Sequence, residues 1–381
     1  EALKQRQPIV ILANTDIEMM SEEVRLVERN FKYVRVMPQH GSPTLATELD
    51  RVCVQDSRAI IMLADEGAVG NIQSKDIPTI KTLMQLQNLE WSNGVPNTVV
   101  EITDQDNVDI ADIATKSSVP VVSSSDFVSK TVVQCSRYLG YSAVYAELFS
   151  FGNNNIVLHS VKGYENKYFG EVAQAFKNSI LLGVSWVEEK NGVERRTAVL
   201  NPEPDYELFD DEELIILTSQ EGPEISSLPT TEIEPLMDVA PYERPVFNRV
   251  LILGWNASII DILREFDGHA VQEVTVTIVS SHSEEFVERI FSGNMAKGLN
   301  QVKVTYKNSD TANRGVLKSL DIPSYDDVIV LADESNPAYD PDSRTSLTLL
   351  MIRELKDALA EDEEFPSVTA EFYDQDTRAL C

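Results

Sequence analysis

Acidic side chains follow apolar runs at four places in the chain, and these carboxylates are its clearest candidates for chemistry. The runs AIIMLAD (59–65) and DVIVLAD (327–333) each end in an aspartate that a glutamate follows, and NTVVEITDQD (97–106) and SVTAEFYDQD (367–376) each end in an Asp-Gln-Asp triplet. Calcium takes six to eight oxygen ligands, chiefly carboxylates and carbonyls on loops. The pattern predicts cation binding by eight residues: Asp65, Glu66, Asp104, Asp106, Asp333, Glu334, Asp374 and Asp376.

The same carboxylates have a second, purely structural interpretation. Aspartate at the end of a strand often caps the following helix or stabilises an exposed turn. No EF-hand spacing is present in the sequence, so the pattern of acids alone does not decide between the two interpretations. Another acidic stretch, EPDYELFDDEE (203–213), is typical of a solvated turn.

The acid-tipped runs belong to an internal repeat. Each Asp-Glu pair precedes a helical pattern, DIPTIKTLMQLQNL (76–89) or DSRTSLTLLMIREL (342–355), and each helix precedes an Asp-Gln-Asp strand. Asp76 and Asp342 stand where an N-cap belongs, and Pro78 is tolerated because it falls in the first turn. Two upstream stretches, 8–20 and 41–54, have counterparts at 274–286 and 308–322 in the same order.

Apolar runs alternating with helical patterns predict βαβ units and a buried parallel sheet. We therefore expect an α/β protein with two Rossmann-like, doubly wound parallel-sheet lobes and a small α+β lobe between them. The expected divisions are a first lobe (1–123), crossover and assembly helices (124–150), a small lobe (151–222), a Pro- and Glu-rich linker (223–247) and a second lobe (248–381).

The two copies of the repeat differ at their ends. The second begins with NRVLILGWNASIIDILREF (248–266), a strand, a tight turn at Gly254 and a helix. Nothing in the first copy corresponds to this strand–helix unit. We therefore expect the first lobe to be incomplete at its N-terminal end and the second at its C-terminal end.

Composition excludes several classes of protein. The formal net charge of −30 disfavours binding to nucleic acid, whose phosphates it would repel. No run of 18 or more apolar residues occurs, so no segment has the pattern of a membrane-spanning helix. The three cysteines and four histidines are too scattered to form a zinc motif.

The sequence also argues against a dinucleotide site and against catalysis. Gly254 is followed by Trp255 and Asn256 instead of further glycines, and the next strand ends in two serines where an acid would bind the ribose. There is no GxSxG motif and no suggestive Cys/His pair for a nucleophile and its base. We expect neither NAD binding nor enzyme activity.

Several stretches resemble the tandem RCK regulatory domains of ion channels, and among these the CASTOR/POLLUX group. They are RAIIMLAD (58–65), NPEPDYELFDDEELIIL (201–217), ILGWNASIIDIL (252–263), VIVLADES (328–335), DSRTSLTLLMIREL (342–355) and DQDTRAL (374–380). A strand followed by Gly-Trp, in place of the glycine-rich fingerprint, is distinctive of that group. The resemblance covers nearly the whole chain.

The resemblance implies a cytosolic gating ring. It implies four chains, each with two such modules, on the cytoplasmic face of a membrane, and a pore covalently attached upstream of residue 1. It also implies regulation by a ligand, with calcium the candidate, and assembly through helices in 124–150. Two alternatives stay open: a peripheral TrkA-type subunit of a potassium transporter, and an NAD-dependent oxidoreductase.

Overall fold

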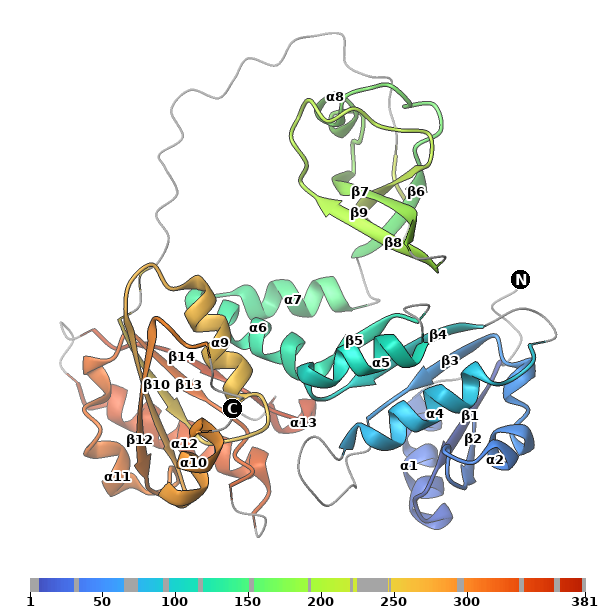
Figure 1. Ribbon diagram of the computed structural model, residues 1–381. Coiled ribbons are helices and arrows are strands. Elements are labelled where there is room, and N and C mark those ends of the chain that lie inside the picture. Colours follow the sequence, from blue (N-terminus) through green and yellow to red (C-terminus); the bar gives the residue numbers. More distant parts are fainter. Residues whose placement is uncertain are drawn as a thin grey trace. The chain divides into compact units, whose positions relative to one another are not determined.

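The computed structural model describes residues 7–30, 34–64, 75–91, 96–115, 119–150, 154–190, 193–219, 222–224, 246, 248–292, 298–335, 339–359 and 364–378. The chain divides into two compact units, Glu1–Ser125 and Asp126–Cys381. Figure 1 shows the first unit in blue to cyan and the second in green to red. None of the helices within the described ranges has the length and apolar character that crossing a bilayer requires.

The first unit, called the first lobe, alternates strands with helices, as the apolar runs predict. Its strands fall into two parallel sheets, β1–β2 and β3–β4–β5. One core joins α2, α4 and α5 to both sheets, and it contains Leu83, Val100, Ile102 and Ala111, with Leu12 packed against it. The elements are β1 (Gln7–Ala13), α1 (Ile17–Asn30), β2 (Val34–His40), α2 (Ala46–Arg51), β3 (Ala59–Met62), α4 (Ile77–Gln87), β4 (Asn97–Ile102), α5 (Val108–Thr115) and β5 (Val121–Ser123).

Two helices follow the first lobe: α6 (Ser124–Arg137) and α7 (Tyr141–Phe149), separated by a turn at Gly140, whose φ is +92°. Such a backbone conformation favours glycine, because it has no Cβ. The next part, called the small lobe, is a four-stranded antiparallel sheet in the order β6-β9-β7-β8. Its elements are β6 (Asn154–Ser160), α8 (Phe169–Ala173), β7 (Ser179–Lys190), β8 (Val193–Leu200) and β9 (Glu212–Ser219).

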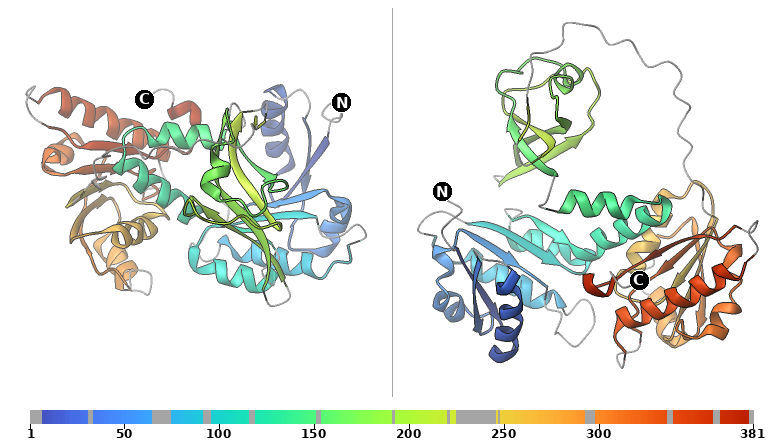
Figure 2. Two further views of the ribbon diagram at one scale, coloured as in Figure 1. Left: turned by 90° about the horizontal axis from the view of Figure 1, so that it is seen from above. Right: turned by 180° about the vertical axis from the view of Figure 1, so that it is seen from behind.

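The second lobe is a five-stranded parallel sheet in the order β12-β11-β10-β13-β14, the doubly wound order in which strand order reverses at β10. The helix α9 covers one face, in front in Figure 1, and α12 covers the other, in front in the right view of Figure 2. Its elements are β10 (Arg249–Leu253), α9 (Ile259–His269), β11 (Val274–Ser280), α10 (Glu284–Ser292), β12 (Val302–Asn308), α11 (Arg314–Lys318), β13 (Asp327–Val330), α12 (Pro341–Asp357), β14 (Ser367–Ala370) and α13 (Gln375–Arg378).

The fold class predicted from the repeat is therefore confirmed: the chain is mixed α/β, with parallel sheets in its first and last parts and an antiparallel sheet between them. The three tryptophans are Trp91 in the first lobe, Trp186 in the small lobe and Trp255 in the second. A protein in which any two are replaced by phenylalanine would report on one lobe by fluorescence.

The second lobe also holds α6. Val132 and Val133 of this helix are buried in the same core as Val250 and Phe266. At the far end of the strands from the acidic loops, the Ser367 hydroxyl lies 2.9 Å from the carboxyl of the fully buried Asp327 and 3.2 Å from the Ser136 carbonyl of α6, and its single hydrogen is shared between these two acceptors. Burial raises the pKa of Asp327 from 3.8 to about 6, although the hydrogen bonds act in the opposite direction.

This buried carboxyl makes stability depend on pH. Because the pKa of Asp327 is higher in the folded than in the unfolded chain, its contribution favours folding at low pH and is lost as pH rises from about 4 to 6. The loss is on the order of 2–3 kcal/mol. We expect Asp327→Asn to abolish this part of the pH dependence, as measured by urea unfolding at pH 4 and pH 7 with Trp255 as the reporter. Parallel pH profiles for the two proteins would contradict it.

Candidate functional site

Carboxylates cross-link the strands at their carboxyl ends in the same way in both lobes. In the first, Glu101 of β4 accepts a hydrogen bond from the Ala64 amide, two residues after β3 (3.1 Å). In the second, Glu371, just after β14, accepts one from the Ala332 amide, two residues after β13 (3.2 Å). Each glutamate accepts from a backbone amide that lies beyond the last hydrogen bond between the two strands. This contact holds together the loops that follow the strands.

A second carboxylate in each lobe lies at the start of a helix, α4 or α12, and joins that helix to the loop after the next strand, β4 or β14. Asp76 accepts from the amides of Thr103 (2.8 Å) and Asp104 (3.0 Å) and from the Asn107 side chain (2.8 Å). The two oxygens of Asp342 accept from the amides of Tyr373 (2.9 Å) and Asp374 (2.7 Å). Both aspartates are buried. The two lobes therefore repeat these hydrogen bonds as well as the sequence pattern.

These contacts correct the capping roles predicted from sequence. Asp76 is at the N-cap position of α4, and Pro78 is in its first turn as predicted, but the Asp76 side chain makes no capping hydrogen bond. The N-cap prediction for Asp342 is wrong, because α12 begins at Pro341 and its N-cap is Asp340, which accepts from the Ser343 amide (2.8 Å). Asp342 instead reaches across to the loop after β14.

Two of the four predicted cation ligands of the first lobe, Asp104 and Asp106, lie in the loop after β4. Asp104 is buried and accepts from the Asp106 amide (3.0 Å), which makes it the N-cap of a short 3-10 helix, Gln105–Asn107. Asp106 is exposed. Asp65 and Glu66 lie outside the described residues.

In the second lobe, Asp333 lies next to a buried cation. Its carboxylate is 2 % exposed and contacts the guanidinium of Arg344, itself 7 % exposed, with Nη2 at 3.1 Å and Nε at 3.2 Å. The other carboxylate oxygen accepts from the amides of Trp255 (3.2 Å) and Ser335 (3.0 Å). This set of donors compensates the charge of Asp333 without a metal ion.

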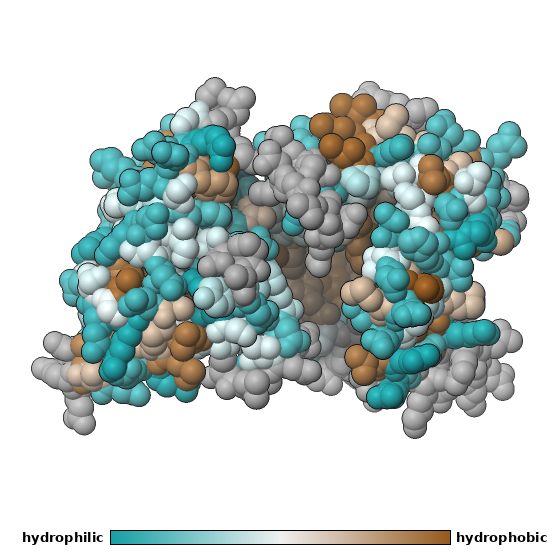
Figure 3. All heavy atoms as spheres, turned by 90° about the horizontal axis from the view of Figure 1, so that it is seen from below, coloured by the Kyte–Doolittle hydropathy of each residue, from teal (hydrophilic) through white to brown (hydrophobic). Residues whose placement is uncertain are grey.

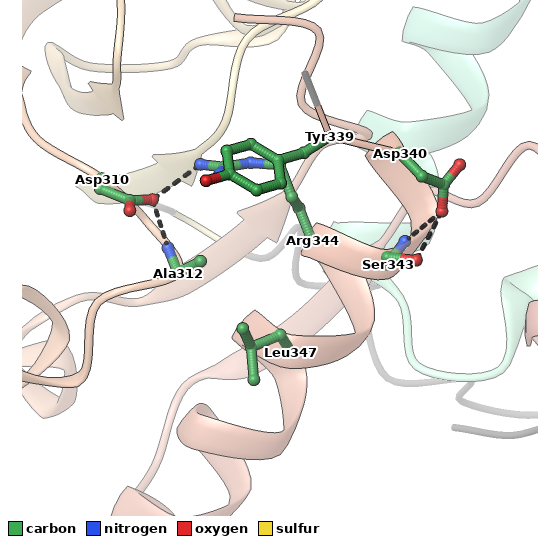
Figure 4. A pocket seen from close by; sticks show the side chains of 7 residues that line it. All are labelled: Asp310, Ala312, Tyr339, Asp340, Ser343, Arg344 and Leu347. Atoms are coloured by element: carbon green, nitrogen blue, oxygen red, sulfur yellow. Dashed lines mark hydrogen bonds and ion pairs between the residues drawn. The ribbon is translucent and has the colours of Figure 1, made fainter. Parts of the chain in front are cut away.

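Arg344 also contacts the exposed Asp310 (2.8 Å), which follows β12, and its guanidinium lies over the Tyr339 ring at 5.5 Å from the centroid. Figure 4 shows the Arg344 side chain between Asp310, which it contacts, and the ring of Tyr339. The pocket here has a volume of about 440 Å³ and is lined by Asp310, Ala312, Tyr339, Asp340, Ser343, Arg344 and Leu347. Because Arg344 already pairs with two carboxylates, we assign the pocket no ligand.

The remaining predicted residues of the second lobe are more exposed. Glu334 accepts a hydrogen bond from the Tyr373 hydroxyl (3.0 Å). Asp374 accepts from the amide (2.8 Å) and hydroxyl (2.7 Å) of Thr377 at the start of α13. The Asp376 side chain lies outside the described residues, although its backbone is part of α13.

Glu371, which sequence reasoning did not select, lies among these acids. It accepts from the Asn256 side chain (2.5 Å), and burial raises the pKa of its carboxyl, opposed by the Ala332 and Asn256 hydrogen bonds and assisted by Glu334 and Asp342. Its signal in the sequence was a glutamate three residues before each Asp-Gln-Asp triplet, at positions 101 and 371. An ionisable residue repeated within an apolar run of the sequence indicates a required contact.

Within the part of the chain that the structure describes, His, Cys, Asp and Glu side chains nowhere form a group of three or more that could hold a metal ion. The structure brings Asp333, Glu334 and Asp374 to one edge of the second sheet, as the order of the strands requires. Cation binding by the eight carboxylates stays a prediction.

The tight turn after β10 leads into a tryptophan that packs in an aromatic cluster. Gly254 has a φ of +99°, and a Cβ there would approach the Leu331 carbonyl to 2.8 Å, so the tight turn requires glycine. The next residue, Trp255, is 7 % exposed, and its ring meets His282, Phe286, Phe291 and Tyr306 at centroid distances of 5.6 to 6.3 Å. Burial lowers the pKa of His282 in this aromatic cluster, and Asp333 acts against that shift.

Comparisons with known proteins agree with this architecture. Residues 1–123 match a family model described as the calcium-activated potassium channel slowpoke-like RCK domain. Residues 125–234 match the model for Castor and Pollux, part of voltage-gated ion channel. The fold is similar to that of the human SLO3 gating ring, with a TM-score of 0.63 at 14% sequence identity, covering 95% of this chain and 69% of that one.

Curated relatives are plant channels. The chain is 25% identical over 366 residues to the probable ion channel POLLUX of Oryza sativa subsp. japonica, covering 94% of this chain and 37% of the relative. It is also 25% identical over 354 residues to the ion channel CASTOR of Lotus japonicus, covering 91% and 40%. The chain thus spans less than half the length of these relatives. The resemblance to the tandem RCK region of CASTOR/POLLUX-like channels is confirmed.

Proposed function

We propose that this chain is the regulatory gating-ring region of a CASTOR/POLLUX-like cation channel and that it lies on the cytosolic face of the membrane. The observation that carries the proposal is similarity to plant ion channels over 94% of the chain. The pore would be covalently attached on the N-terminal side of residue 1. The chain's role is then to sense a ligand and not to catalyse a reaction.

We infer that four chains assemble into a ring through α6 and α7. The helix α7 is rich in apolar residues, yet none of its residues is buried. Its rings continue those of α6, because Phe149 meets Phe127 (5.2 Å between centroids) and Tyr141 stacks on Tyr138 (4.7 Å). Exposed aromatic area of this kind is typical of interfaces between proteins.

Calcium is the ligand we propose, with the strand-end carboxylates as its ligands. The family model that matches the first lobe is named for calcium-activated channels. The exposed carboxylates Glu334, Asp374 and Asp106 are the better candidates, since Asp333 is already paired with Arg344. A cation that binds one shape of the ring more tightly than another shifts the ring toward that shape by the difference in affinity.

A calorimetric titration of the chain with calcium, with magnesium as the control, tests this proposal. We expect saturable heat with calcium but not with magnesium, at a dissociation constant of about 10⁻⁷ to 10⁻⁵ M, the range of calcium-sensor sites. Glu334→Gln with Asp374→Asn should weaken the second-lobe site at least about tenfold, a loss of about 1.4 kcal/mol. The control removes the same charge from the small lobe, with Asp210→Asn and Asp211→Asn.

For the first-lobe cluster, the corresponding variant is Asp65→Ala with Asp104→Ala. If the strand-end variants and the small-lobe control lose the same amount of calcium affinity, the loss is due to the change in net charge and not to removed ligands. If calcium produces no heat of binding with the unaltered chain, the proposal is wrong and the carboxylates have only their structural role as hydrogen-bond acceptors.

A further inference from the structure

The small lobe has an open sheet edge at β6. The neighbouring strand β9 pairs with β6 on one side, and none of the described strands pairs with it on the other. The ladder with β9 keeps one register over all 7 residues of β6, without a bulge. The sequence of β6, NNIVLHS, contains no lysine, arginine, aspartate, glutamate or proline. Soluble proteins usually block such an edge with charge, proline or a bulge, because an open edge is a site for another strand.

Two other sheet edges in this chain carry charge. The opposite edge of the same sheet is β8, whose Arg196 is exposed. The edge strand β12 of the second lobe carries Lys303 and Lys307. A lysine or arginine at an edge keeps a second strand away, because pairing would remove its charge from water. Of these three edges, only β6 is without that protection.

The edge at β6 offers apolar surface on both faces of the sheet. On the inner face, Val157 packs against the core of the small lobe beside Ile216 of β9. On the outer face, Ile156 and Leu158 are 53% and 46% exposed, although the outer face of a sheet packed on one side is usually polar. Single exposed apolar residues are common, and several appear in brown on the face in Figure 3. At β6 they lie along an open edge, so an added strand would bury them.

We propose that β6 is the docking strand for a second copy of this chain, and that the two β6 strands pair antiparallel about Val157. In this register Ile156 of each copy lies opposite Leu158 of the other, on the outer face of the sheet. On the inner face, Asn155 lies opposite His159, and the two Val157 side chains meet at the two-fold axis. The sheets of two small lobes then form one continuous sheet.

The pattern of side chains along β6 favours a second copy of the chain over an unrelated partner. Reversing the strand about Val157 brings apolar residues opposite apolar ones and polar residues opposite polar ones, so the strand is complementary to itself. The chain has a formal net charge of −30 and therefore repels its own copies. Two copies meet with the least repulsion at a strand without charge, since no like charges come to lie directly opposite each other.

This contact is distinct from the proposed ring interface and goes beyond it. A two-fold contact cannot join neighbours in a ring of four chains with four-fold symmetry, so pairing through β6 links one ring to another. The pairing uses residues of β6, whereas the ring is proposed to assemble through α6 and α7. The two contacts can therefore be removed separately by substitution.

Analytical ultracentrifugation of residues 1–381 at increasing concentration tests the pairing. The edge variant, Ile156→Lys with Leu158→Lys, brings like charges directly opposite each other and should weaken the contact at least about tenfold. The control variant, Ile180→Lys with Leu200→Lys, changes the same residue types in the same two cross-strand rows of the outer face, at exposures of 60% and 65%, away from β6. It should associate like the unaltered chain. Equal weakening by both variants would indicate face-to-face packing of the sheets, and no weakening by either would mean that β6 makes no contact; each result overturns the proposal.

A variant on α7 separates this contact from the ring. Val144→Lys, at a residue that is 52% exposed, should break the α6–α7 interface, and the chain should then stop at the dimer formed through β6. The edge variant should instead stop at the ring of four. If the chain forms no ring, the unaltered protein should still dimerise and the edge variant should be monomeric. If Val144→Lys leaves only monomers, the proposed pairing is wrong. Trp186, as the sole tryptophan, verifies that the small lobe of each variant is folded.

Disulfide cross-linking gives a second measurement, which reports the register. Ile156→Cys and Leu158→Cys are made as separate proteins in a chain whose natural cysteines, Cys53, Cys135 and Cys381, are replaced by serine. A mixture of the two proteins should cross-link at least about tenfold faster than either alone, because directly opposite Cβ atoms lie about 5 Å apart and diagonal ones about 7–8 Å. Equal rates for the mixture and for the separate proteins would overturn the proposed pairing.

Discussion

Replacing Arg344 with leucine should lower the free energy of unfolding of the second lobe by about 3–5 kcal/mol. The guanidinium is almost fully buried and is the only cation that contacts Asp333 among the described ion pairs. Its removal leaves the carboxylate of Asp333 buried without a counter-charge, and the desolvation penalty of an uncompensated buried charge is large. Urea unfolding with Trp255 as the reporter measures the loss.

Two further variants separate the buried charge from the packing. Arg344→Leu combined with Asp333→Asn should recover part of the stability, because it removes the isolated charge together with the arginine. Asp310→Ala removes only the exposed partner, 53% accessible, and should cost less than about 1 kcal/mol. A small effect of Arg344→Leu, comparable with that of Asp310→Ala, would show that the pair contributes little.

The strands and their alternation with helices could be predicted from the sequence because those depend on local pattern. Runs such as VIVLAD and AIIMLAD are apolar on both faces, as central parallel strands must be, and their repetition set the architecture. The exposure of Ile61 and Leu63, however, becomes visible only when their surroundings are known.

The contacts of the carboxylates could not be predicted in the same way. Asp342 looks like an N-cap from its neighbours, but its partners are the amides of residues 373 and 374 in a loop that only the folded sheet brings near. Asp333 looks like a free carboxylate, but Arg344 on the next helix neutralises it. Spacing indicates which residues share an edge of a sheet, whereas the choice of partner depends on side-chain geometry.

These contacts narrow the cation hypothesis. If calcium bound through Asp333, it would have to displace Arg344 or share the carboxylate with it, and either cost would lower the affinity. Binding through Glu334 and Asp374 requires smaller changes, because both side chains are exposed and neither contacts a buried cation in the described ion pairs. The strand-end edge thus separates into a rigid, charge-compensated part and an exposed part, and we place sensing in the exposed part.

The rigid part can be tested in both lobes at once. Asp342→Ala should lower the stability of the second lobe by about 2–4 kcal/mol, because two backbone amides lose a charged acceptor. Asp76→Ala should cost the first lobe a similar amount, since two amides and the Asn107 side chain lose theirs. Trp255 and Trp91, each as the sole tryptophan, report the two transitions separately.

Each substitution serves as the control for the other. Asp342→Ala should leave the Trp91 transition in place, and Asp76→Ala should leave the Trp255 transition in place, if each carboxylate acts only within its own lobe. Asp342→Asn and Asp76→Asn retain one acceptor oxygen and should cost roughly half as much. If the alanine variants keep full stability but lose calcium binding, the two aspartates are ligands and the hydrogen bonds to the loops are incidental. If the alanine variants lose stability but their folded fraction still binds calcium, Asp76 and Asp342 have a structural role, and they position the loops that carry the exposed acids.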